Sequence, residues 1–257
     1  MIKAIITDLD RTLLRTDKSI SDYTLDVLRM CKEQGVLLLA ASARPMRTIK
    51  EYKEAVGFDA VTAMNGAAVY LPGKEFKFGI PKESGEKILG QFIKDEKAFL
   101  SIETDRGIYS NREIPEWSPI LYDGFPVLPE NCTLYKILAS SENPLFYEKI
   151  EQKLTEDTYH SIAHSGVINR LVQVMSKNAT KWNGIKEMLS FFGIDPAEAV
   201  YFGDDNDDIQ PIQNCGIGVA MANSIPAVLA VADVVTSSND EDGVATFIER
   251  TFLKELK

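Results

Sequence analysis

A short apolar run at the start of the chain ends in two carboxylates, and this stretch limits the fold more than any other. Residues 2–6 are rich in β-branched side chains, as a buried strand is, and Asp8 and Asp10 follow with one residue between them. In an open parallel α/β sheet, ligands bind at the carboxyl ends of the strands. Two like charges this close raise one another's pKa unless a cation lies between them. The stretch predicts a metal-assisted carboxylate site; an acidic turn or helix cap is the alternative interpretation.

Apolar strands and amphipathic helices then alternate along the chain. The predicted elements are a helix capped by Ser21, a strand over 36–41, a helix from Pro45 to about residue 56 and a strand over 59–64. Short loops join them. A β–α–β–α–β order with short loops predicts a Rossmann-like, doubly wound parallel sheet of the α/β class.

The pattern changes in the middle of the chain. A helix over 83–96 is followed by short strands, a proline-rich link, a helix over 144–154 and a strand pair around 160–175. This order is typical of an α+β domain with an antiparallel sheet. The earlier pattern then returns, with helices over 181–192 and 243–256 and strands over 199–202, 216–221 and 233–236. We therefore expect a core domain of residues 1–80 and 178–257, with a second domain, 81–177, inserted into it.

Composition excludes several kinds of protein. The chain has 257 residues, of which 45% are hydrophobic, so it can bury a sizeable core. Its net charge of −10 argues against a nucleic-acid backbone as the main partner. No apolar run approaches the roughly 18 residues of a membrane span, and we expect no signal peptide. Three widely spaced cysteines indicate reduced thiols, so we expect a cytoplasmic protein.

Further polar residues follow the predicted strands. Ser42 follows the second strand, and Lys181 begins the helix after the inserted segment. Three carboxylates follow the next strand: Asp204, Asp207 and Asp208. Phosphoryl transfer requires a nucleophile, a cation for the spreading negative charge and fixed donors to the phosphoryl oxygens. Carboxylates can act as the nucleophile and can hold Mg²⁺, and Ser42 and Lys181 can donate. The pattern predicts a Mg²⁺-dependent phosphoryl-transfer site.

These motifs, in this order, resemble those of the haloacid dehalogenase (HAD) superfamily. The matching segments are Asp8-Leu9-Asp10-Arg11-Thr12-Leu13-Leu14, Ser42-Ala43-Arg44-Pro45, Asn65-Gly66-Ala67, Lys181, and Gly203-Asp204 with Asp208. The long insert before Lys181 resembles the C2B cap of the Cof-type subfamily IIB. The resemblance covers the whole chain. It implies a HAD-like catalytic core and an inserted cap that determines substrate specificity.

The resemblance also implies roles for single residues. Asp8 would be the nucleophile and Asp10 the general acid/base. Mg²⁺ would be bound by the carboxylates of Asp8 and Asp204 and the backbone carbonyl of Asp10, with Asp208 acting through water. Ser42 and Lys181 would hold the phosphoryl group. Our further candidates are Asp207 for the metal, and Ala43, Arg44, Asn65 and the cap residue Arg170 for the substrate.

The chain departs from the family pattern at three positions. Arg11 and Ala43 stand where the family usually has glycine, and Asp207 stands where it usually has asparagine. The first two departures predict that these backbone positions need no positive φ. The charge of Asp207 should strengthen Mg²⁺ binding and weaken phosphate binding, and we expect Arg11 to compensate for it.

Several candidates also have a purely structural interpretation. Ser42 would then cap a helix, Lys181 would be an exposed first-turn lysine, and Asn65 would belong to a plain turn with Gly66. Arg44 has a structural role as its alternative. The acidic run at 204–208 would be a turn before a helix.

Three functions are compatible with the sequence. The first is a Mg²⁺-dependent phosphatase of small phosphorylated metabolites, with sugar phosphates as the default substrate. The second is a phosphotransferase or phosphomutase that passes the phosphoryl group of the aspartyl-phosphate to a hydroxyl group. The third is a regulatory protein that binds a phosphorylated ligand with little turnover. We expect neither nucleic acid nor membrane as a partner.

Overall fold

The computed structural model describes residues 2–148, 150–163 and 168–253. The chain divides into two compact units, each with its own sheet. The core unit comprises Met1–Phe76 and Thr180–Lys257, and the inserted unit comprises Lys77–Ala179. The boundaries expected from the sequence, 1–80 with 178–257 and 81–177, lie within a few residues of these.

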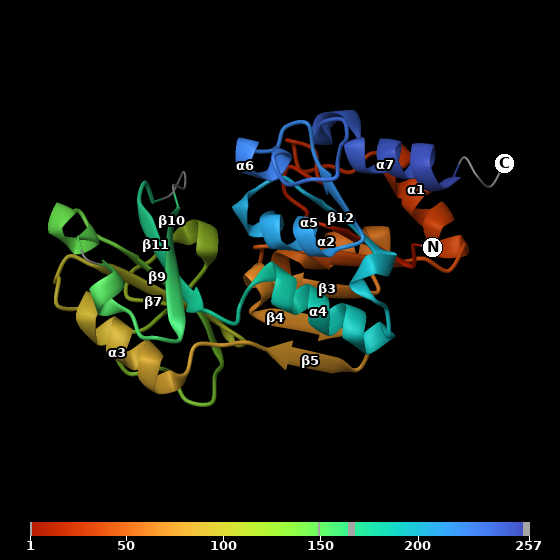
Figure 1. The fold of residues 1–257 in the computed structure, drawn as a ribbon. Helices are drawn as coiled ribbons and strands as arrows, with labels where there is room; N and C mark the ends of the chain where they lie inside the picture. The colour runs from red at the N-terminus through yellow and green to blue at the C-terminus, as the bar shows by residue number, and fades with distance from the viewer. Residues whose placement is uncertain (1, 149, 164–167, 254–257) are drawn as a thin grey trace. The chain divides into compact units, whose positions relative to one another are not determined.

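Eight strands of the described chain form the core sheet, in the order β14-β13-β12-β1-β2-β3-β4-β5 (Figure 1). Neighbouring strands from β14 to β3 are parallel. Their bounds are β1 Ala4–Thr7, β2 Leu37–Ala41, β3 Ala60–Ala63, β12 Ala199–Gly203, β13 Ile217–Ala220 and β14 Val234–Val235. All four residues of β1 are buried, because helices cover both faces, and this explains its continuous apolar run. The predicted α/β class with a Rossmann-like core is confirmed.

One edge of the core sheet is antiparallel, which the sequence analysis did not predict. Strand β4, Ala68–Leu71, pairs antiparallel with β3, and β5, Lys74–Lys77, follows at the edge. Gly73 lies between them with a φ of 69°, a left-handed conformation that glycine adopts without strain. The signal was present as a Pro-Gly turn between two short runs, but each strand has only four residues.

Helices pack on both faces of the core sheet. The cluster on one face joins Val27, Ile49 and Val244 from three helices to Val61 and Ala63 of β3. Thr62 points to the opposite face, because side chains alternate along a strand, and there it meets Gly184. A Cβ on Gly184 would lie 2.1 Å from Thr62 Oγ1, so this helix approaches the sheet closely. The helices on the first face are α1 Asp22–Glu33, α2 Met46–Val56 and α7 Gly243–Ile248. The other described α-helices of the core unit are α4 Lys181–Phe192, α5 Ile209–Asn214 and α6 Pro226–Leu229.

The helix ends agree with their local sequence. Ser21 Oγ accepts a hydrogen bond from the Thr24 amide at 3.0 Å and caps α1, as expected. The predicted last helix is shorter than expected, because a π-helical turn, Glu249–Leu253, replaces its continuation and its final residues lie outside the described part. Short 3₁₀ turns occur at Met64–Gly66, Pro196–Glu198, Asn206–Asp208 and Asn239–Glu241.

The inserted unit is an α+β layer structure. Within the described residues its sheet has the order β10-β11-β9-β6-β7-β8, and its pairs are antiparallel except β7 with β8. Helix α3 packs Ile88, Leu89 and Phe92 against one face, where Ile102 and Val172 are buried. The bounds are α3 Lys82–Phe92, β6 Phe99–Thr104, β7 Gly107–Ser110, β8 Ile120–Leu121, β9 Leu134–Ser140, β10 Thr158–Ala163 and β11 Leu171–Ser176.

One helix predicted in this unit is wrong. Residues 144–154 form two 3₁₀ turns, Pro144–Tyr147 and Ile150–Lys153, instead of one α-helix. Phe146 and Ile150 are buried, so their four-residue spacing reflects packing on the sheet. A third 3₁₀ turn lies at Pro115–Trp117. Residues 164–167, between β10 and β11, lie outside the described part.

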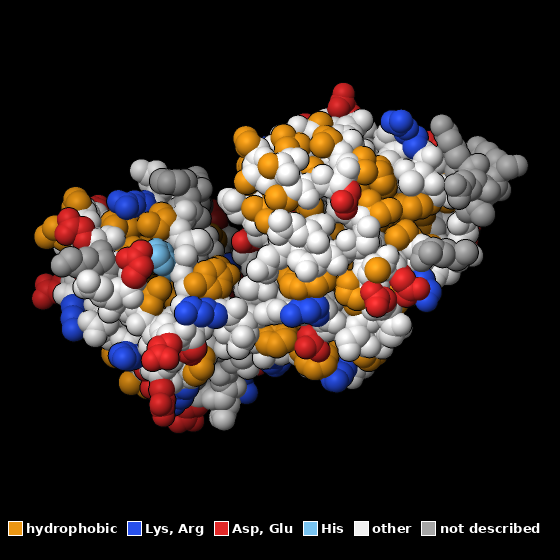
Figure 2. Space-filling view, viewed as in Figure 1, with side chains coloured by type: hydrophobic (Ala, Val, Ile, Leu, Met, Phe, Trp, Pro, Cys, Tyr) orange, Lys and Arg blue, Asp and Glu red, His pale blue; other side chains and the backbone are white. Residues whose placement is uncertain are grey.

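The surface agrees with the acidic composition. On the face seen in Figure 2, lysine and arginine side chains lie singly or in small groups among acidic and apolar ones. The described residues on that face form no continuous basic surface of the kind that binds a nucleic-acid backbone. Within the described chain, no helix combines the length and apolar character that a membrane crossing requires.

Candidate active site

Three carboxylates meet where β1 and β12 end. Asp8 directly follows β1 and Asp204 directly follows β12, and the two strands are neighbours in the sheet. One oxygen from each of Asp8, Asp204 and Asp208 lies within 4.8 Å of the other two. The three side chains are buried, with exposed fractions of 6%, 3% and 0%. The sequence analysis grouped these residues for this reason, since parallel strands bring their carboxyl ends to one edge.

Lys181 is the cation that the fold brings to this group. It is the first residue of α4, and its ammonium lies 3.0 Å from Asp8 Oδ1 and 2.7 Å from Asp208 Oδ1. Burial alone would lower the pKa of Lys181, but Asp208, Asp8 and Asp207 outweigh it and raise the pKa above its ordinary value. Lys181 is 4% exposed, so the alternative of a solvated first-turn lysine is wrong.

The buried group carries an excess of negative charge. Burial raises the pKa of Asp8 to about 8, with Asp208 and Asp204 adding to it and Lys181 opposing it. Burial also raises the pKa of Asp204 to about 6. A hydrogen bond from Thr12 Oγ1 at 2.9 Å acts in the opposite direction and lowers this pKa. One ammonium faces three carboxylates, so the ionised group is short of positive charge. Hard oxygen ligands arranged in this way fit a divalent cation such as Mg²⁺.

Asp208 anchors the loop more than it offers ligand atoms. Its Oδ1 accepts hydrogen bonds from Lys181 and from the buried Tyr201 hydroxyl. Its Oδ2 accepts from the backbone amides of Asp204 and Asp205, at 2.9 and 3.0 Å. With four donors on its two oxygens, Asp208 orients Lys181 and Asp204, and the assignment of Asp8 and Asp204 as direct metal ligands stays a prediction. Tyr201 stands in an apolar strand like an ordinary core residue, so no sequence signal pointed to this contact.

Asp10 lies apart from the three buried carboxylates. Arg44 binds it through Nε and Nη2 at 2.6 and 2.7 Å, and Lys18 Nζ donates to it at 2.7 Å. Burial would raise the pKa of Asp10, but the hydrogen bonds from Arg44 and Lys18 lower it to about 2. The Arg44 guanidinium also lies 5.3 Å from the centre of the Tyr52 ring. In this structure the Asp10 side chain is bound by Arg44 and Lys18, and no sequence signal pointed to Lys18.

Ser42 and its neighbours form the turn after β2. Ser42 is buried, and its Oγ accepts a hydrogen bond from the Arg44 amide at 3.2 Å. It does not cap α2, whose N-cap position is Pro45. Ala43 is exposed and its φ is not positive, as its departure from glycine predicts. The assignment of Ser42, Ala43 and Arg44 to phosphate or substrate stays a prediction.

Arg11 contradicts one prediction. Its φ is 59°, so this position does require the left-handed conformation that the family's glycine would adopt without strain. Asn223 supports the turn, because its Nδ2 donates to the Arg11 carbonyl at 2.8 Å and its own carbonyl accepts from the Arg11 side chain. The Arg11 Nε lies 3.9 Å from Asp204 Oδ2. The charge that Arg11 meets is therefore that of Asp204, and the expected compensation of Asp207 by Arg11 has no support in these contacts.

We expect Arg11→Gly to be more stable than Arg11→Ala by roughly 1 kcal/mol. Both variants remove the guanidinium, but only alanine keeps a Cβ in the left-handed region, which costs about 1–2 kcal/mol, partly offset by the greater chain entropy of unfolded glycine. Urea unfolding of the two variants measures the difference. Equal midpoints would show that the positive φ carries no strain.

Asp207 and Asn65 meet beside this group. Asn65 Nδ2 donates to Asp207 Oδ2 at 2.7 Å. Asp207 is exposed, and it is not among the clustered carboxylates, so this arrangement gives its assignment as a metal ligand no support. Asn65 is 7% exposed and has a φ of 54°, and its backbone N–H donates to the Ser42 carbonyl. It is thus a buried constituent of the site, beyond its role in a turn.

The glycine after Asn65 fixes this turn against α4. Gly66 has a φ of 96°, and a Cβ there would lie 2.0 Å from the Thr180 carbonyl oxygen. Thr180 caps α4 through its side chain, which accepts from the Asn183 amide at 3.1 Å. The turn that carries Asn65 therefore packs directly against the residue before Lys181.

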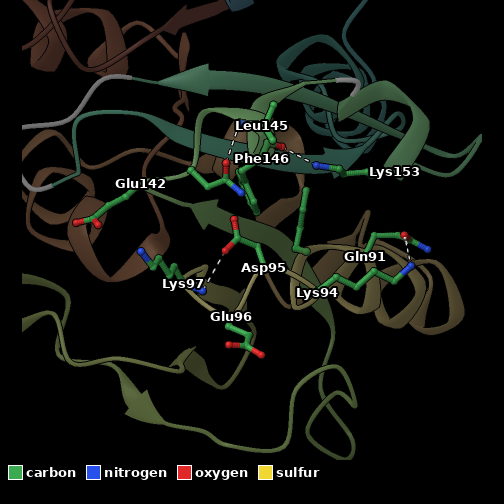
Figure 3. Close-up of a pocket in the computed structure, with 11 residues that line it drawn as sticks. Gln91, Lys94, Asp95, Glu96, Lys97, Glu142, Leu145, Phe146 and Lys153 are labelled. Carbon is green, nitrogen blue, oxygen red and sulfur yellow. Dashed lines mark hydrogen bonds between the residues drawn. The ribbon is translucent and has the colours of Figure 1, made fainter.

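The inserted unit holds the remaining candidate and a hollow of its own. The Arg170 guanidinium lies 3.9 Å from the centre of the Tyr147 ring, and its assignment to substrate stays a prediction. A hollow of about 790 Å³ lies within the unit (Figure 3). Among the described residues, equal numbers of lysines and carboxylates line this hollow, so their charge does not favour a phosphate: Lys94, Lys97, Lys153, Asp95, Glu96 and Glu142.

The fold and the site define a hydrolase of the haloacid dehalogenase type. The family model of haloacid dehalogenase-like hydrolases matches residues 5–248, so the chain belongs to this family. Curated relatives that cover almost the whole chain include several named as phosphatases, and the long insert is that of the Cof-type subfamily IIB, as the sequence predicted.

Two curated relatives and one solved structure illustrate the similarity. The 5-amino-6-(5-phospho-D-ribitylamino)uracil phosphatase YitU of Bacillus subtilis is 24% identical, with 96% of this chain and 97% of that protein covered. A phosphoglycolate phosphatase of Methanopyrus kandleri is also 24% identical, over 100% and 99%. The structure of the phosphatase BT1666 of Bacteroides thetaiotaomicron is 25% identical, with a TM-score of 0.79 over 97% and 95% of the two chains.

Proposed function

We propose that the protein is a Mg²⁺-dependent phosphatase that hydrolyses small phosphorylated metabolites through an aspartyl-phosphate on Asp8. The observation that carries this proposal is the buried group at the edge of the core sheet, in which Lys181 Nζ lies 3.0 Å from Asp8. The family of hydrolases to which the chain belongs supports the same reaction. Asp8 and Asp204 would hold Mg²⁺, whose charge would offset that of the phosphoryl oxygens.

Each residue of the group has a defined task in this reaction. An Asp8 carboxylate oxygen attacks phosphorus, and the bond to the leaving alkoxide breaks. Lys181 is charged and buried, so its ammonium can bind a phosphoryl oxygen while it orients Asp8. Ser42 supplies a further donor to the phosphoryl group. The inserted unit acts as the cap that selects the substrate, with Arg170 as a candidate contact.

Asp10 acts as the general acid/base, and its contacts with Arg44 and Lys18 affect in which step it can hold a proton. The leaving alkoxide needs a proton from Asp10, but Arg44 and Lys18 keep this carboxylate ionised in the structure. Those hydrogen bonds must loosen before Asp10 can carry a proton. In the second half-reaction, water attacks the aspartyl-phosphate, and the ionised carboxylate is the form that accepts the water proton.

Charge and the relatives support a class of substrate to test first. One curated relative is named for a phosphorylated ribityl compound, which is a polyol phosphate. The net charge of −10 favours small phosphate esters over polyanions. We therefore take phosphorylated sugars and polyols as the first substrates to test. We expect neither nucleic acid nor membrane as a partner.

A panel of phosphorylated metabolites, assayed with and without Mg²⁺, tests the proposal. We expect release of inorganic phosphate that requires Mg²⁺ and stops when a chelator is added. An isomeric phosphorylated product without free phosphate would identify a phosphomutase. Ligand binding without turnover of any ester would leave the regulatory interpretation and contradict the phosphatase.

We expect Asp10→Asn to slow hydrolysis of a sugar phosphate far more than that of p-nitrophenyl phosphate. General acid catalysis contributes roughly 10²–10⁴-fold, and nitrophenolate leaves without needing a proton. The two kcat/KM values, each taken relative to the wild type, measure the difference. Equal losses on the two substrates would show that Asp10 is not the acid that protonates the leaving group.

A further inference from the structure

Asp207 presents a carboxylate that the proposed reaction does not use. It belongs to the loop that carries Asp204 and Asp208, yet it is exposed where they are buried. Asn65 Nδ2 donates to its Oδ2 at 2.7 Å, which orients the carboxylate. Its charge reaches the phosphoryl-binding lysine, because Asp207 is among the carboxylates that raise the pKa of Lys181 against the effect of burial.

A second acceptor lies beside it. Asn65 Oδ1 is buried, and no hydrogen-bond donor of the described residues reaches it. The amide cannot turn over to exchange its two ends, because its oxygen would then face the Asp207 carboxylate. Because this oxygen is closed to solvent, the acceptor of the pair that a bound ligand can reach is the exposed Asp207 carboxylate.

The neighbours hold this pair in place. The backbone N–H of Asn65 donates to the Ser42 carbonyl at 3.0 Å. Gly66 packs against Thr180, the residue before Lys181. Asn65, which orients the Asp207 carboxylate, therefore packs beside Ser42 and next to Lys181, the two residues proposed to bind the phosphoryl group. Groups that only accept hydrogen bonds favour a ligand that donates and disfavour one that is negatively charged.

We propose that Asp207, oriented by Asn65, is a specificity-determining residue that favours phosphate monoesters whose leaving group carries a hydrogen-bond donor. An ammonium group fits best, a hydroxyl next, and a carboxylate is disfavoured. This inference rests on the proposed phosphatase function. It replaces the expectation that Asp207 acts chiefly on the metal.

Three two-carbon phosphate monoesters of similar size test the order: 2-aminoethyl phosphate, 2-hydroxyethyl phosphate and 2-phosphoglycolate. Their distal groups are an ammonium, a hydroxyl and a carboxylate. We expect kcat/KM of the wild type to fall in that order, by roughly tenfold or more from first to last, because two unit charges change about 5 Å from Asp207 even in a water-like dielectric. In Asp207→Asn the three values should lie within a factor of about two to three.

Asp205→Asn is the matched control. It removes the same charge from the same exposed loop, and asparagine can keep the hydrogen bond that Asp205 Oδ1 accepts from the Asn206 amide at 2.7 Å. The order of the three esters should persist in this variant. Asn65→Ala, which removes the orienting amide, should weaken the order as Asp207→Asn does.

Binding gives a readout that does not depend on turnover. In the Asp8→Asn background, calorimetric dissociation constants for the three esters should follow the same order, and the added Asp207→Asn change should remove it. Hydrolysis of all three esters with equal efficiency would overturn this inference and leave the phosphatase proposal standing. A loss of the order in Asp205→Asn as well would overturn it too. Failure to bind or hydrolyse any of the three and p-nitrophenyl phosphate would contradict both proposals.

Discussion

Asp8→Asn is expected to lower phosphatase turnover by several orders of magnitude without loss of the fold. The amide is nearly isosteric with the carboxylate but cannot act as the nucleophile. Its oxygen can still accept the hydrogen bond that Lys181 donates at 3.0 Å. The variant also removes one charge from a buried group with too many carboxylates, so its melting temperature without divalent cations should be no lower than that of the wild type.

The measurement is kcat on the best substrate of the metabolite panel, with thermal unfolding alongside. Asp17→Asn is the matched control, because Asp17 is an exposed carboxylate of the loop after β1 and lies outside the group. It should retain turnover near that of the wild type. An Asp8→Asn variant that keeps even a tenth of the wild-type rate would exclude Asp8 as the nucleophile.

Lys181→Met is expected to destabilise the metal-free protein by about 3–5 kcal/mol and to abolish turnover. Breaking a buried ion pair by removing one partner leaves the other charge uncompensated, and here two carboxylates, Asp8 and Asp208, lose the same partner. The substitution keeps most of the side-chain volume, so the loss reports charge more than packing. Added Mg²⁺ should recover part of the stability, since cation binding stabilises the folded state by mass action.

Chemical denaturation with and without Mg²⁺ measures both effects. Lys186→Met is the control, because Lys186 is exposed on the same helix and lies 6.0 Å from the centre of the Trp182 ring. Its free energy of unfolding should change by less than about 1 kcal/mol. A Lys181→Met variant as stable as this control would show that Lys181 does not neutralise the buried carboxylates.

Local sequence patterns determined the frame of this site. The apolar run before Asp8 and the one before Asp204 each predicted a buried strand, and short connections predicted parallel pairing. Once two such strands are neighbours, their carboxyl ends meet, so the approach of Asp8 to Asp204 needs no further information. The position of Lys181 at a helix start follows from Thr180 as its N-cap.

Contacts between distant segments decided the rest. The bidentate contact of Arg44 with Asp10 joins residues 34 positions apart, and that of Asn65 with Asp207 joins residues 142 apart. Neither pair has a local pattern, because a long polar side chain can reach several partners and its choice depends on where the loops pack. The sequence analysis accordingly paired Asp207 with Arg11, and the structure pairs it with Asn65.

Backbone conformation was also decided by tertiary structure. The positive φ of Arg11 is held by Asn223, 212 residues away, and a single arginine carries no sign of that constraint. The sequence by itself determined which residues stand at the ends of the strands, since each strand buried on both faces appears as a continuous apolar run with a clear end. The tertiary structure alone decided which charges those residues face. Side-chain and loop contacts depend on packing between segments that are far apart in the sequence, and no local sequence pattern indicates which of them will meet.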